Sequence, residues 1–481
     1  MEGAATPGSR RAWIGLVAIG FCVLAPAMDT SVNIAMPSIT AAFQLGQRDI
    51  QWVVTCYMLA YASLMLTCGK LGDLYGHRRI LRAGLLVSAV AFSICALATA
   101  YPGLLVGRTL QGVGIALAVS CAPALATALY PDSGRTRVLG IYGAIFALGT
   151  ALGPFVGSLL VAAFGWSGVF AFRVPVVLLA LALSWLLPAG VPSGAATARG
   201  AHPFDWTGAV LLILWISALM LACAGPHDLA LAFPTLPEWV PNGTALGWSL
   251  AAFGCATLAA FLWHEARFAE PIIRPNLFRS DRFAVLNAAN LLINIANFSI
   301  LLIVPYFLIN AAHLRIDRAG LVMAMSGVGM MLGSWLTGRI ARSISAARLA
   351  FAGMVATSLG LLSVAQWRPD APLWELAGTL LFQGFGVGLF QVAYNDSVIA
   401  TLPAHDRGVA GSLTMMVRTL GIIGGATGLS ALLQWRLDMA ATSGLRGDDA
   451  FLLAFQETLT TAGIGLLAAL ALTLLRPQVW R

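Results

Sequence analysis

The stretch that decides the fold is GKLGDLYGHRR, residues 69–79, which lies between the apolar runs 50–69 and 80–100. A second, degenerate copy of its Gly-to-Arg spacing occurs at residues 338–348, again after a long apolar run. Both copies fall in loops that follow an out-to-in apolar segment, as expected for parallel repeats. The pattern therefore indicates a membrane protein built from two related halves.

The composition of the whole chain agrees with a membrane protein. Of 481 residues, 59% are hydrophobic and only 10% are charged, and the mean hydropathy is +0.84. Soluble domains have about 25% charged residues. The 50 glycines suit closely packed membrane helices. These figures exclude a soluble globular enzyme, a disordered chain and a nucleic-acid-binding protein, and they predict an all-α polytopic membrane protein.

Apolar runs long enough to cross a bilayer recur along the sequence. A helix needs about 20 apolar residues to span the hydrocarbon. By this rule we expect fourteen spans, at 13–37, 50–69, 80–100, 104–128, 138–163, 168–188, 206–224, 246–264, 283–309, 317–340, 347–366, 374–402, 409–434 and 452–475. The first run has no small-residue cleavage site after it, so we expect a retained span and not a signal peptide.

The basic residues give an orientation. If residues 1–12 are placed in the cytoplasm, 19 of the 28 lysines and arginines fall inside, six fall outside and three lie within spans. This asymmetry follows the positive-inside rule. We therefore expect a multi-pass protein of the cell membrane, by default the bacterial inner membrane, with both termini in the cytoplasm.

Charges within the spans point to function, because each costs about 2.5–3.5 kcal/mol at a helix centre. Asp29 in the first span lies about 12 Å below its outer end, and Arg108 in the fourth lies about 6 Å deep. Long side chains could bridge these depths. Asn33 shares a helix face with Asp29, and Gln111 shares one with Arg108.

Two interpretations of Asp29 and Arg108 are open. An arginine stabilises a nearby carboxylate charge, and the carboxylate takes up a proton when the arginine moves away, which would make a proton-coupling switch. Alternatively, the two form a fixed ion pair between helices, or Arg108 extends towards the outer surface.

A polar stripe marks the ninth span. Its members are asparagines within an arc of about 80° on one helix face: Asn287, Asn290, Asn294 and Asn297. Such a stripe suits the wall of a substrate cavity, to which Gln383, Gln391 and Asn395 of the twelfth span could add. The other interpretation is hydrogen bonding between helices.

Three further charges are weaker candidates. Arg173 lies near the outer end of the sixth span, where extension towards the surface is the simpler expectation. Asp396 and Glu457 lie near span ends, where a local partner would suffice.

Other chemistry finds no support in the sequence. It contains no Gly-x-x-x-x-Gly-Lys-Ser/Thr, so we expect no ATP site, and His264-Glu265 lacks the second histidine of a zinc protease. The seven cysteines are expected to be packing residues. We therefore expect no metal, no cofactor and no enzymatic activity. A receptor or sensor would more often carry a large soluble module, and no loop here exceeds about 25 residues.

Taken together, the motifs resemble the major facilitator superfamily, and within it the fourteen-span drug:proton antiporter-2 branch, over nearly the whole chain. The resemblance rests on residues 69–79, DTSVNIAMP at 29–37, the 105–114 segment with Arg108, the 149–157 segment, Asp205-Trp206-x-Gly208, and Glu265 to Arg279. It implies two six-helix bundles: a tail at 1–12, an N-terminal bundle at 13–188, a linker and two extra spans at 189–265 with an outer loop at 225–245, and a C-terminal bundle at 266–481.

The resemblance also implies residue roles. Asp29 and Arg108 would couple protons. A cytoplasmic conformational latch would comprise Gly69, Gly72, Asp73, Gly76, Arg78 and Arg79, and an antiporter-motif helix would carry Gly149, Gly153, Pro154 and Gly157. One departure is Arg173, where the family usually has asparagine before Val-Pro; an added arginine there suits a less cationic substrate.

The sequence thus predicts a proton-coupled transporter that exports lipophilic small molecules by alternating access. Its expected partners are the substrate, protons and the lipid bilayer, with the proton gradient as energy source and no ATP or nucleic acid; we expect a monomer. The alternative is a transporter of the same fold dedicated to one metabolite or natural product, in either direction.

Overall fold

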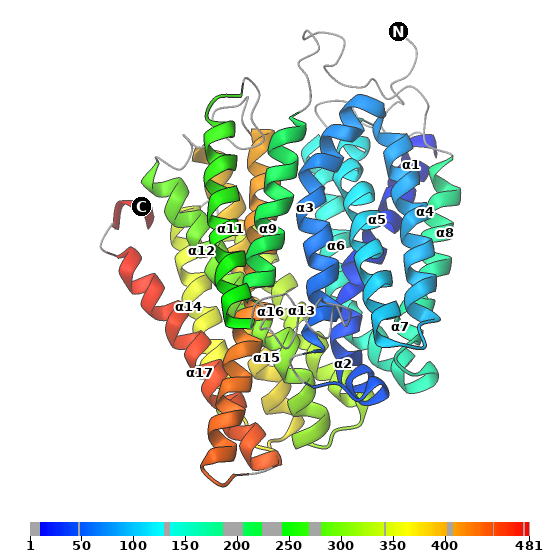
Figure 1. The fold of residues 1–481 in the computed structure, drawn as a ribbon. Coiled ribbons are helices and arrows are strands. Elements are labelled where there is room, and N and C mark those ends of the chain that lie inside the picture. Colours follow the sequence, from blue (N-terminus) through cyan, green and yellow to red (C-terminus); the bar gives the residue numbers. More distant parts are fainter. Residues whose placement is uncertain are drawn as a thin grey trace, which may run out of the picture. The chain divides into compact units, whose positions relative to one another are not determined.

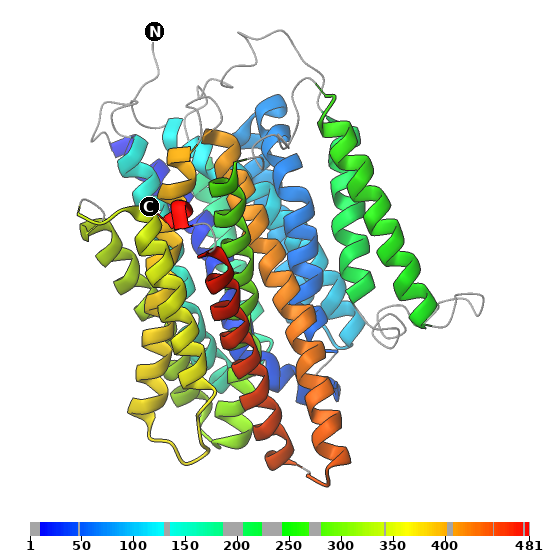
Figure 2. The ribbon, with the colours of Figure 1, turned by 90° about the vertical axis from the view of Figure 1, so that its left-hand side faces the viewer.

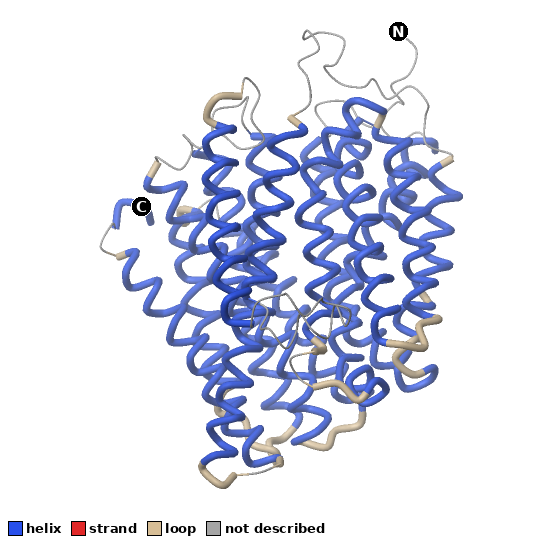
Figure 3. The backbone as a smooth tube through the Cα atoms, in the orientation of Figure 1, coloured by secondary structure: helices blue, strands red, loops and turns tan. Residues whose placement is uncertain are grey.

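The structure, a computed structural model, describes residues 10–46, 49–128, 135–185, 205–223, 243–268, 280–340, 343–401, 407–445, 447–474 and 477–480. Within these ranges the regular structure is entirely helical (Figure 3). An all-helical fold is what the apolar composition predicts, because a helix satisfies its own backbone polar groups in lipid.

The chain forms two compact units. The first comprises residues 1–29, 52–150 and 164–272, and the second comprises 30–51, 151–163 and 273–481. The first unit therefore contains most of the expected N-terminal bundle together with the two extra spans. The stretches 30–51 and 151–163 of that bundle belong to the second unit.

The first unit contains nine helices in the described part of the chain, counting α6 up to residue 150. They are α1 (Arg10–Ala27), α3 (Gln51–Tyr75), α4 (His77–Ala96), α5 (Tyr101–Ala128), α6 (Arg135–Phe164, up to residue 150), α7 (Gly168–Ala171), α8 (Arg173–Ser184), α9 (Trp206–Cys223) and α11 (Gly243–Glu265). Helices α9 and α11 lie side by side (Figure 1, Figure 2). This hairpin is formed by the two expected extra spans.

The second unit holds the remaining helices. They are α2 (Ser31–Phe43), α12 (Asp281–Tyr306) with a π-helical turn at Phe307–Ala311, α13 (Ile316–Ile340), α14 (Ala346–Val364), α15 (Leu373–Thr401), α16 (Arg407–Thr442), α17 (Asp448–Thr473) and a 3-10 turn at Pro477–Trp480. Helix α15 packs along both α13 and α14.

Each of the fourteen expected ranges coincides with a helix or a pair of helices. In the described part of the chain, eight helical stretches are long and apolar enough to cross a membrane, and three further apolar helices are shorter. The multi-pass helical fold is therefore confirmed, whereas the number of helices that cross the membrane stays a prediction.

The first span is not the uninterrupted helix that its apolar run suggests. Helix α1 ends at Ala27, a 3-10 turn covers Met28–Thr30, and α2 begins at Ser31. Pro26 lies in the last turn of α1 and lacks the N–H of a regular helical bond. The break places Asp29 on the short turn, and such mid-helix turns often mark functional positions.

Candidate functional site: a buried carboxylate between two arginines

Asp29 is the centre of a buried ion cluster in the first unit. Arg108 binds it with both terminal nitrogens: Nη1 lies 2.8 Å from Oδ1 and Nη2 lies 3.0 Å from Oδ2. Arg173 Nη1 lies 2.6 Å from Oδ1, and Gln111 Nε2 donates to the same oxygen at 3.0 Å. The two-point pair with Arg108 is the geometry that fixes a carboxylate most firmly.

Neutral oxygens accept further hydrogen bonds from the two guanidinium groups. Arg108 Nε donates to Val53 O at 2.6 Å and Nη1 donates to Gln111 Oε1 at 2.7 Å. Arg173 Nη2 donates to Met28 O at 2.8 Å, on the turn that interrupts the first span. Both arginine side chains are fully buried, whereas the Asp29 side chain is 11% exposed.

Aromatic rings surround the two cations. The Arg108 guanidinium carbon lies 4.5 Å from the Tyr57 ring centroid, and that of Arg173 lies 5.3 Å from the Phe92 centroid. The Phe170 ring lies 5.8 Å from Arg108 and 5.9 Å from Arg173. These rings stabilise the cations and keep the surroundings apolar, which strengthens every charge interaction inside.

Close helix packing brings the partners of Arg108 within reach. A Cβ at Gly112 of α5 would overlap Tyr57 O and lie 2.7 Å from the Ala60 Cβ of α3. Only glycine therefore allows this approach, which sets Val53 and Tyr57 against the Arg108 side chain.

The chemistry of the cluster follows from its charges. With Asp29 ionised, the carboxylate holds helices α5 and α8 to the turn of the first span through two cations. A proton on Asp29 removes the attraction for both cations at once, and the low local dielectric makes that change large. The cluster can therefore convert protonation into a change of helix contacts.

The polar residues of the second unit form a neutral network. Asn287 Nδ2 donates to Phe283 O at 2.9 Å, and its Oδ1 accepts a hydrogen bond from Tyr394 OH at 2.9 Å. Asn294 Nδ2 donates to Asn290 O at 2.7 Å and to Asn290 Oδ1 at 3.0 Å. These asparagines are buried. Their hydrogen bonds join α12 to α15 and also connect successive turns within α12.

A second part of this network joins three helices. Gln383 Nε2 of α15 donates to Asn297 Oδ1 of α12 at 2.7 Å, and Ser326 Oγ of α13 donates to Gln383 Oε1 at 3.1 Å. Gln391 and Asn395 lie half-buried further along α15. The predicted cavity residues of the second unit thus include several that serve as helix-to-helix contacts.

Comparison with known families decides the identity of the fold. The family model of the Major Facilitator Superfamily matches residues 18–426. The chain belongs to this superfamily. Its members are transporters, and the multi-pass helical fold described above agrees with that assignment.

Curated members of the superfamily resemble the chain over most of its length. The riboflavin transporter RibZ of Clostridioides difficile is 27% identical over 413 residues, which cover 85% of this chain and 86% of RibZ. The multidrug resistance protein Stp of Mycobacterium tuberculosis is 29% identical over 431 residues, 89% of this chain and 77% of Stp.

Solved structures of the superfamily share the fold. A bacterial homologue of the human lysosomal transporter Spinster, in an inward-facing and unoccupied conformation, matches with a TM-score of 0.70. The alignment covers 98% of each chain at 16% sequence identity. The similarity concerns the fold alone.

Residues 69–79, expected as a loop, are helical except for Gly76: residues 69–75 end α3 and residues 77–79 begin α4, with the sharp turn at Gly76. Gly76 has a φ of 92°, a conformation that other L-residues rarely adopt. A Cβ at Gly72 would overlap His77, whereas Gly69 leaves ordinary contact space. Arg78 Nη2 donates to Trp185 O at 2.8 Å, at the end of α8.

Two further residues of the expected latch are Arg79 and Asp73. Arg79 is exposed, and the Asp73 side chain lies outside the described part of the structure. The latch role therefore stays a prediction.

The glycine ridge of α6 lies against the first span at its break. A Cβ at Gly149 would lie 2.7 Å from the Ala27 Cβ in the first unit. In the second unit, one at Gly153 would overlap Thr30 Oγ1 and one at Gly157 would lie 2.7 Å from the Ser31 Cβ. Pro154, between them, is buried. The ridge thus leaves space for the 3-10 turn that carries Asp29.

Other predicted residues belong to the second unit. Asn33 is buried on α2, in the second unit. Asp396 is exposed on α15. Glu457 Oε2 pairs with Arg436 Nη1 at 3.2 Å, a local partner of the kind expected at a span end.

Arg173 is the functional residue that sequence reasoning misjudged. It does not extend to the surface but lies fully buried on Asp29. Its depth, five residues into the sixth span, is close to that of Arg108, and this match was the available signal. The aromatic partners Tyr57, Phe92 and Phe170 had no such signal, because aromatic residues are common in apolar spans.

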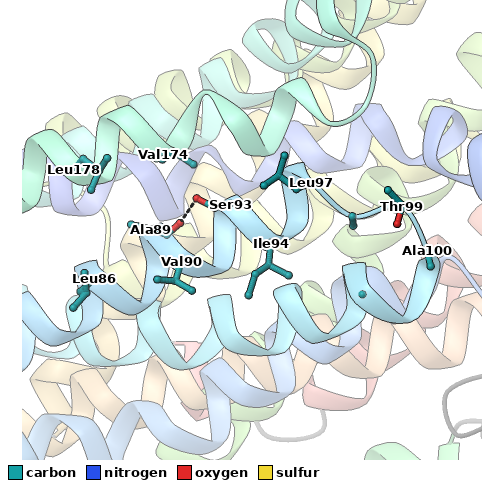
Figure 4. A pocket seen from close by; sticks show the side chains of 12 residues that line it. Leu86, Ala89, Val90, Ser93, Ile94, Leu97, Thr99, Ala100, Val174 and Leu178 are labelled. Atoms are coloured by element: carbon teal, nitrogen blue, oxygen red, sulfur yellow. Dashed lines mark hydrogen bonds between the residues drawn. The ribbon is translucent and has the colours of Figure 1, made fainter.

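An apolar groove in the first unit has no residue of the ion cluster in its lining. It measures about 650 Å³ and is lined mainly by apolar residues of α4, of the turn between α4 and α5, and of α8, with Ser93 and Thr99 as polar members (Figure 4). The Ser93 hydroxyl donates to Ala89 O at 2.9 Å, and Leu86, Val90 and Leu97 are exposed. A membrane protein presents such apolar surface to lipid.

Proposed function

We propose that this member of the major facilitator superfamily is a proton-coupled exporter of lipophilic small molecules that works by alternating access. The observation that carries the proposal is the buried Asp29 carboxylate, held by two arginines at a break in the first span. We place the protein in the fourteen-span drug:proton antiporter-2 branch. We also place it in a bacterial inner membrane with both termini in the cytoplasm.

The mechanism follows from the charges of the cluster. In the inward-facing protein, Asp29 is ionised and a compound enters from the cytoplasm or inner leaflet. The loaded protein turns outward with Asp29 ionised. There a proton from outside neutralises Asp29 as the compound leaves, loosens its attachment to Arg108 and Arg173, and permits the halves to rock back, after which Asp29 releases the proton to the cytoplasm. Each proton that moves inward gains about 2.3 kcal/mol per 100 mV, so one or two protons can drive accumulation outside.

The relatives support a drug or antibiotic as substrate class. Proteins similar to this chain include the multidrug resistance protein Stp and a methylenomycin A resistance protein. A second candidate function is transport of one dedicated metabolite, which the similarity to a riboflavin transporter favours.

The test of proton-coupled export is efflux from cells that express the full chain. Wild type should extrude a fluorescent lipophilic dye, an uncoupler should stop the efflux, and Asp29→Asn should abolish it at equal membrane abundance. Asp317→Asn is the matched control, because Asp317 is an exposed carboxylate paired with Arg315. Efflux that persists in Asp29→Asn would contradict the assignment of Asp29.

A resistance screen separates the two candidate functions. Protection against several unrelated toxic compounds supports the exporter of broad range. Protection against one chemical class, or none, together with transport of a single metabolite, supports the dedicated transporter.

A further inference from the structure

A polar groove lies in the second unit, beside α17 and the two helices that pack along it, α14 and α16 (Figure 1). Its volume is about 330 Å³, which is room for roughly ten water molecules and therefore for a small polar group. Its lining residues are all polar or charged: Gln366, Arg436, Gln456, Glu457, Thr460 and Thr461.

The groove opens on a face of α17 that also presents apolar side chains outward. Leu453 and Ile464 are exposed, and Glu457 and Thr460 lie between them on the same helix face, at spacings of three and four residues. Helix α17 is long and apolar enough to cross a membrane. A polar patch therefore interrupts an apolar stripe that would otherwise face only acyl chains.

The depth of this patch corresponds to one boundary of the hydrocarbon. About 20 helical residues cross the hydrocarbon. Counted back from the end of α17 at Thr473, they reach residue 454, so Glu457 lies about one turn inside the boundary. On α16, the exposed Trp435 lies beside Arg436, and tryptophan is enriched where headgroups meet acyl chains.

The groove holds one charge of each sign. Arg436 Nη1 lies 3.2 Å from Glu457 Oε2, and the two side chains are 28% and 39% exposed, so both are within reach of a ligand. This ion pair uses one terminal nitrogen of a guanidinium that has five N–H donors, and one oxygen of the carboxylate. The groove therefore still offers donors beside Arg436 and an acceptor on Glu457.

We propose that this groove binds the headgroup of a zwitterionic phospholipid with a primary ammonium, phosphatidylethanolamine. The phosphate accepts hydrogen bonds from Arg436 and the ammonium donates to Glu457, so each charge of the lipid meets its opposite. The acyl chains extend over the exposed apolar residues of α17. The inference goes beyond the proposed function, because lipid binding needs neither Asp29 nor a proton gradient.

The charges of the groove also disfavour other lipids. Phosphatidylglycerol has a phosphate and no ammonium, so it would add a net negative charge next to Glu457. Phosphatidylcholine is zwitterionic, but its trimethylated ammonium has no N–H to donate to the carboxylate. The groove thus distinguishes lipids by the headgroup and not by the acyl chains.

The test measures lipid binding to the purified full chain in detergent by native mass spectrometry. Phosphatidylethanolamine, phosphatidylcholine and phosphatidylglycerol with identical acyl chains are compared. Wild type should bind phosphatidylethanolamine at least about ten-fold more tightly than the other two, and Arg436→Gln/Glu457→Gln should reduce that ratio to about two-fold or less.

A matched double variant controls for the loss of an ion pair as such. Arg315→Gln/Asp317→Asn removes an exposed pair of the same unit, at 3.3 Å, and should keep the wild-type ratio. The thermal midpoint of each variant, measured without added lipid, shows that it is folded. Arg436→Lys keeps the positive charge and should keep most of the preference.

Four results would overturn the inference. They are equal binding of the three lipids by wild type, an unchanged ratio in Arg436→Gln/Glu457→Gln, an equal loss in the control variant, and no bound lipid. Soluble glycerophosphoethanolamine separates a lipid site from a site for the free headgroup. It should compete only weakly, and competition as strong as that of the lipid would contradict the role of the apolar stripe.

Discussion

The two units of this transporter stabilise their buried polar groups in different ways, one with charges and the other with neutral hydrogen bonds. The first gathers one carboxylate and two guanidinium groups inside aromatic surroundings. In the second, the predicted cavity residues that form hydrogen bonds between described residues are amides, joined to one another, to hydroxyls and to backbone carbonyls. Both units are assembled from helices of similar apolar composition.

This difference shows which unit can respond to protons. The energy of a buried ion pair changes by several kcal/mol when one partner loses its charge. A hydrogen bond made by a buried amide side chain contributes about 0.6 kcal/mol in membrane proteins. Amide side chains do not titrate between the pH values on the two sides of the membrane. Under the proposed function, energy coupling therefore belongs to the first unit, whereas the amides of the second unit serve as helix contacts.

The largest effect is expected from Asp29→Asn. It leaves two buried cations without a carboxylate, which costs about 3–5 kcal/mol, a factor above one hundred in the corresponding equilibrium. The rate of gradient-driven transport, measured as dye uptake into proteoliposomes, should fall by a similar factor. Normal gradient-driven transport in the variant would show that charge in the first unit is dispensable.

A steric change beside the cluster should have a smaller effect. Gly153→Ala adds a Cβ that overlaps Thr30 Oγ1, next to the turn that carries Asp29, and such overpacking costs about 1–3 kcal/mol. The thermal midpoint of the purified protein should fall. Gly378→Ala is the control, because nothing lies within 4 Å of a Cβ there; an equal change in both variants would contradict the described packing.

A second substitution should restore part of the stability lost in Asp29→Asn. Removing Arg173 as well deletes one of the two uncompensated cations, so Asp29→Asn/Arg173→Asn should melt above Asp29→Asn alone, with an interaction of about 0.5–3 kcal/mol. Differential scanning fluorimetry in detergent measures this. Additive losses in the double variant would mean that Arg173 does not interact with Asp29.

The smallest effect is expected in the second unit. Tyr394→Phe removes the donor to Asn287 Oδ1 and should cost about 0.6 kcal/mol. The rate of transport should change little, and the number of protons moved per substrate should not change. A loss of proton coupling in this variant would contradict the claim that proton coupling depends on the first unit.

The sequence alone predicted much of this picture. Long apolar runs fix helices because lipid leaves no other way to satisfy the backbone, and the cost of charge in a span singled out Asp29 and Arg108. Gln111 followed from its helical spacing. These residues do lie together in the structure.

The rest depended on three-dimensional packing. The break at Met28–Thr30 was not evident, although Pro26 was its local signal. The burial of Arg173 required the sixth span to lie beside the first, which span counting does not reveal. The asparagines of α12 are equally compatible with a cavity wall and with helix contacts, and only their partners distinguish the two.

The most direct test of the central claim compares two modes of transport in one variant. In proteoliposomes, Asp29→Asn should lose uptake driven by a proton gradient but retain exchange of labelled for unlabelled substrate without a gradient, since exchange needs no net proton movement. Wild type and Asp317→Asn should perform both. Gradient-driven uptake in Asp29→Asn at the wild-type rate would show that the proton is carried elsewhere.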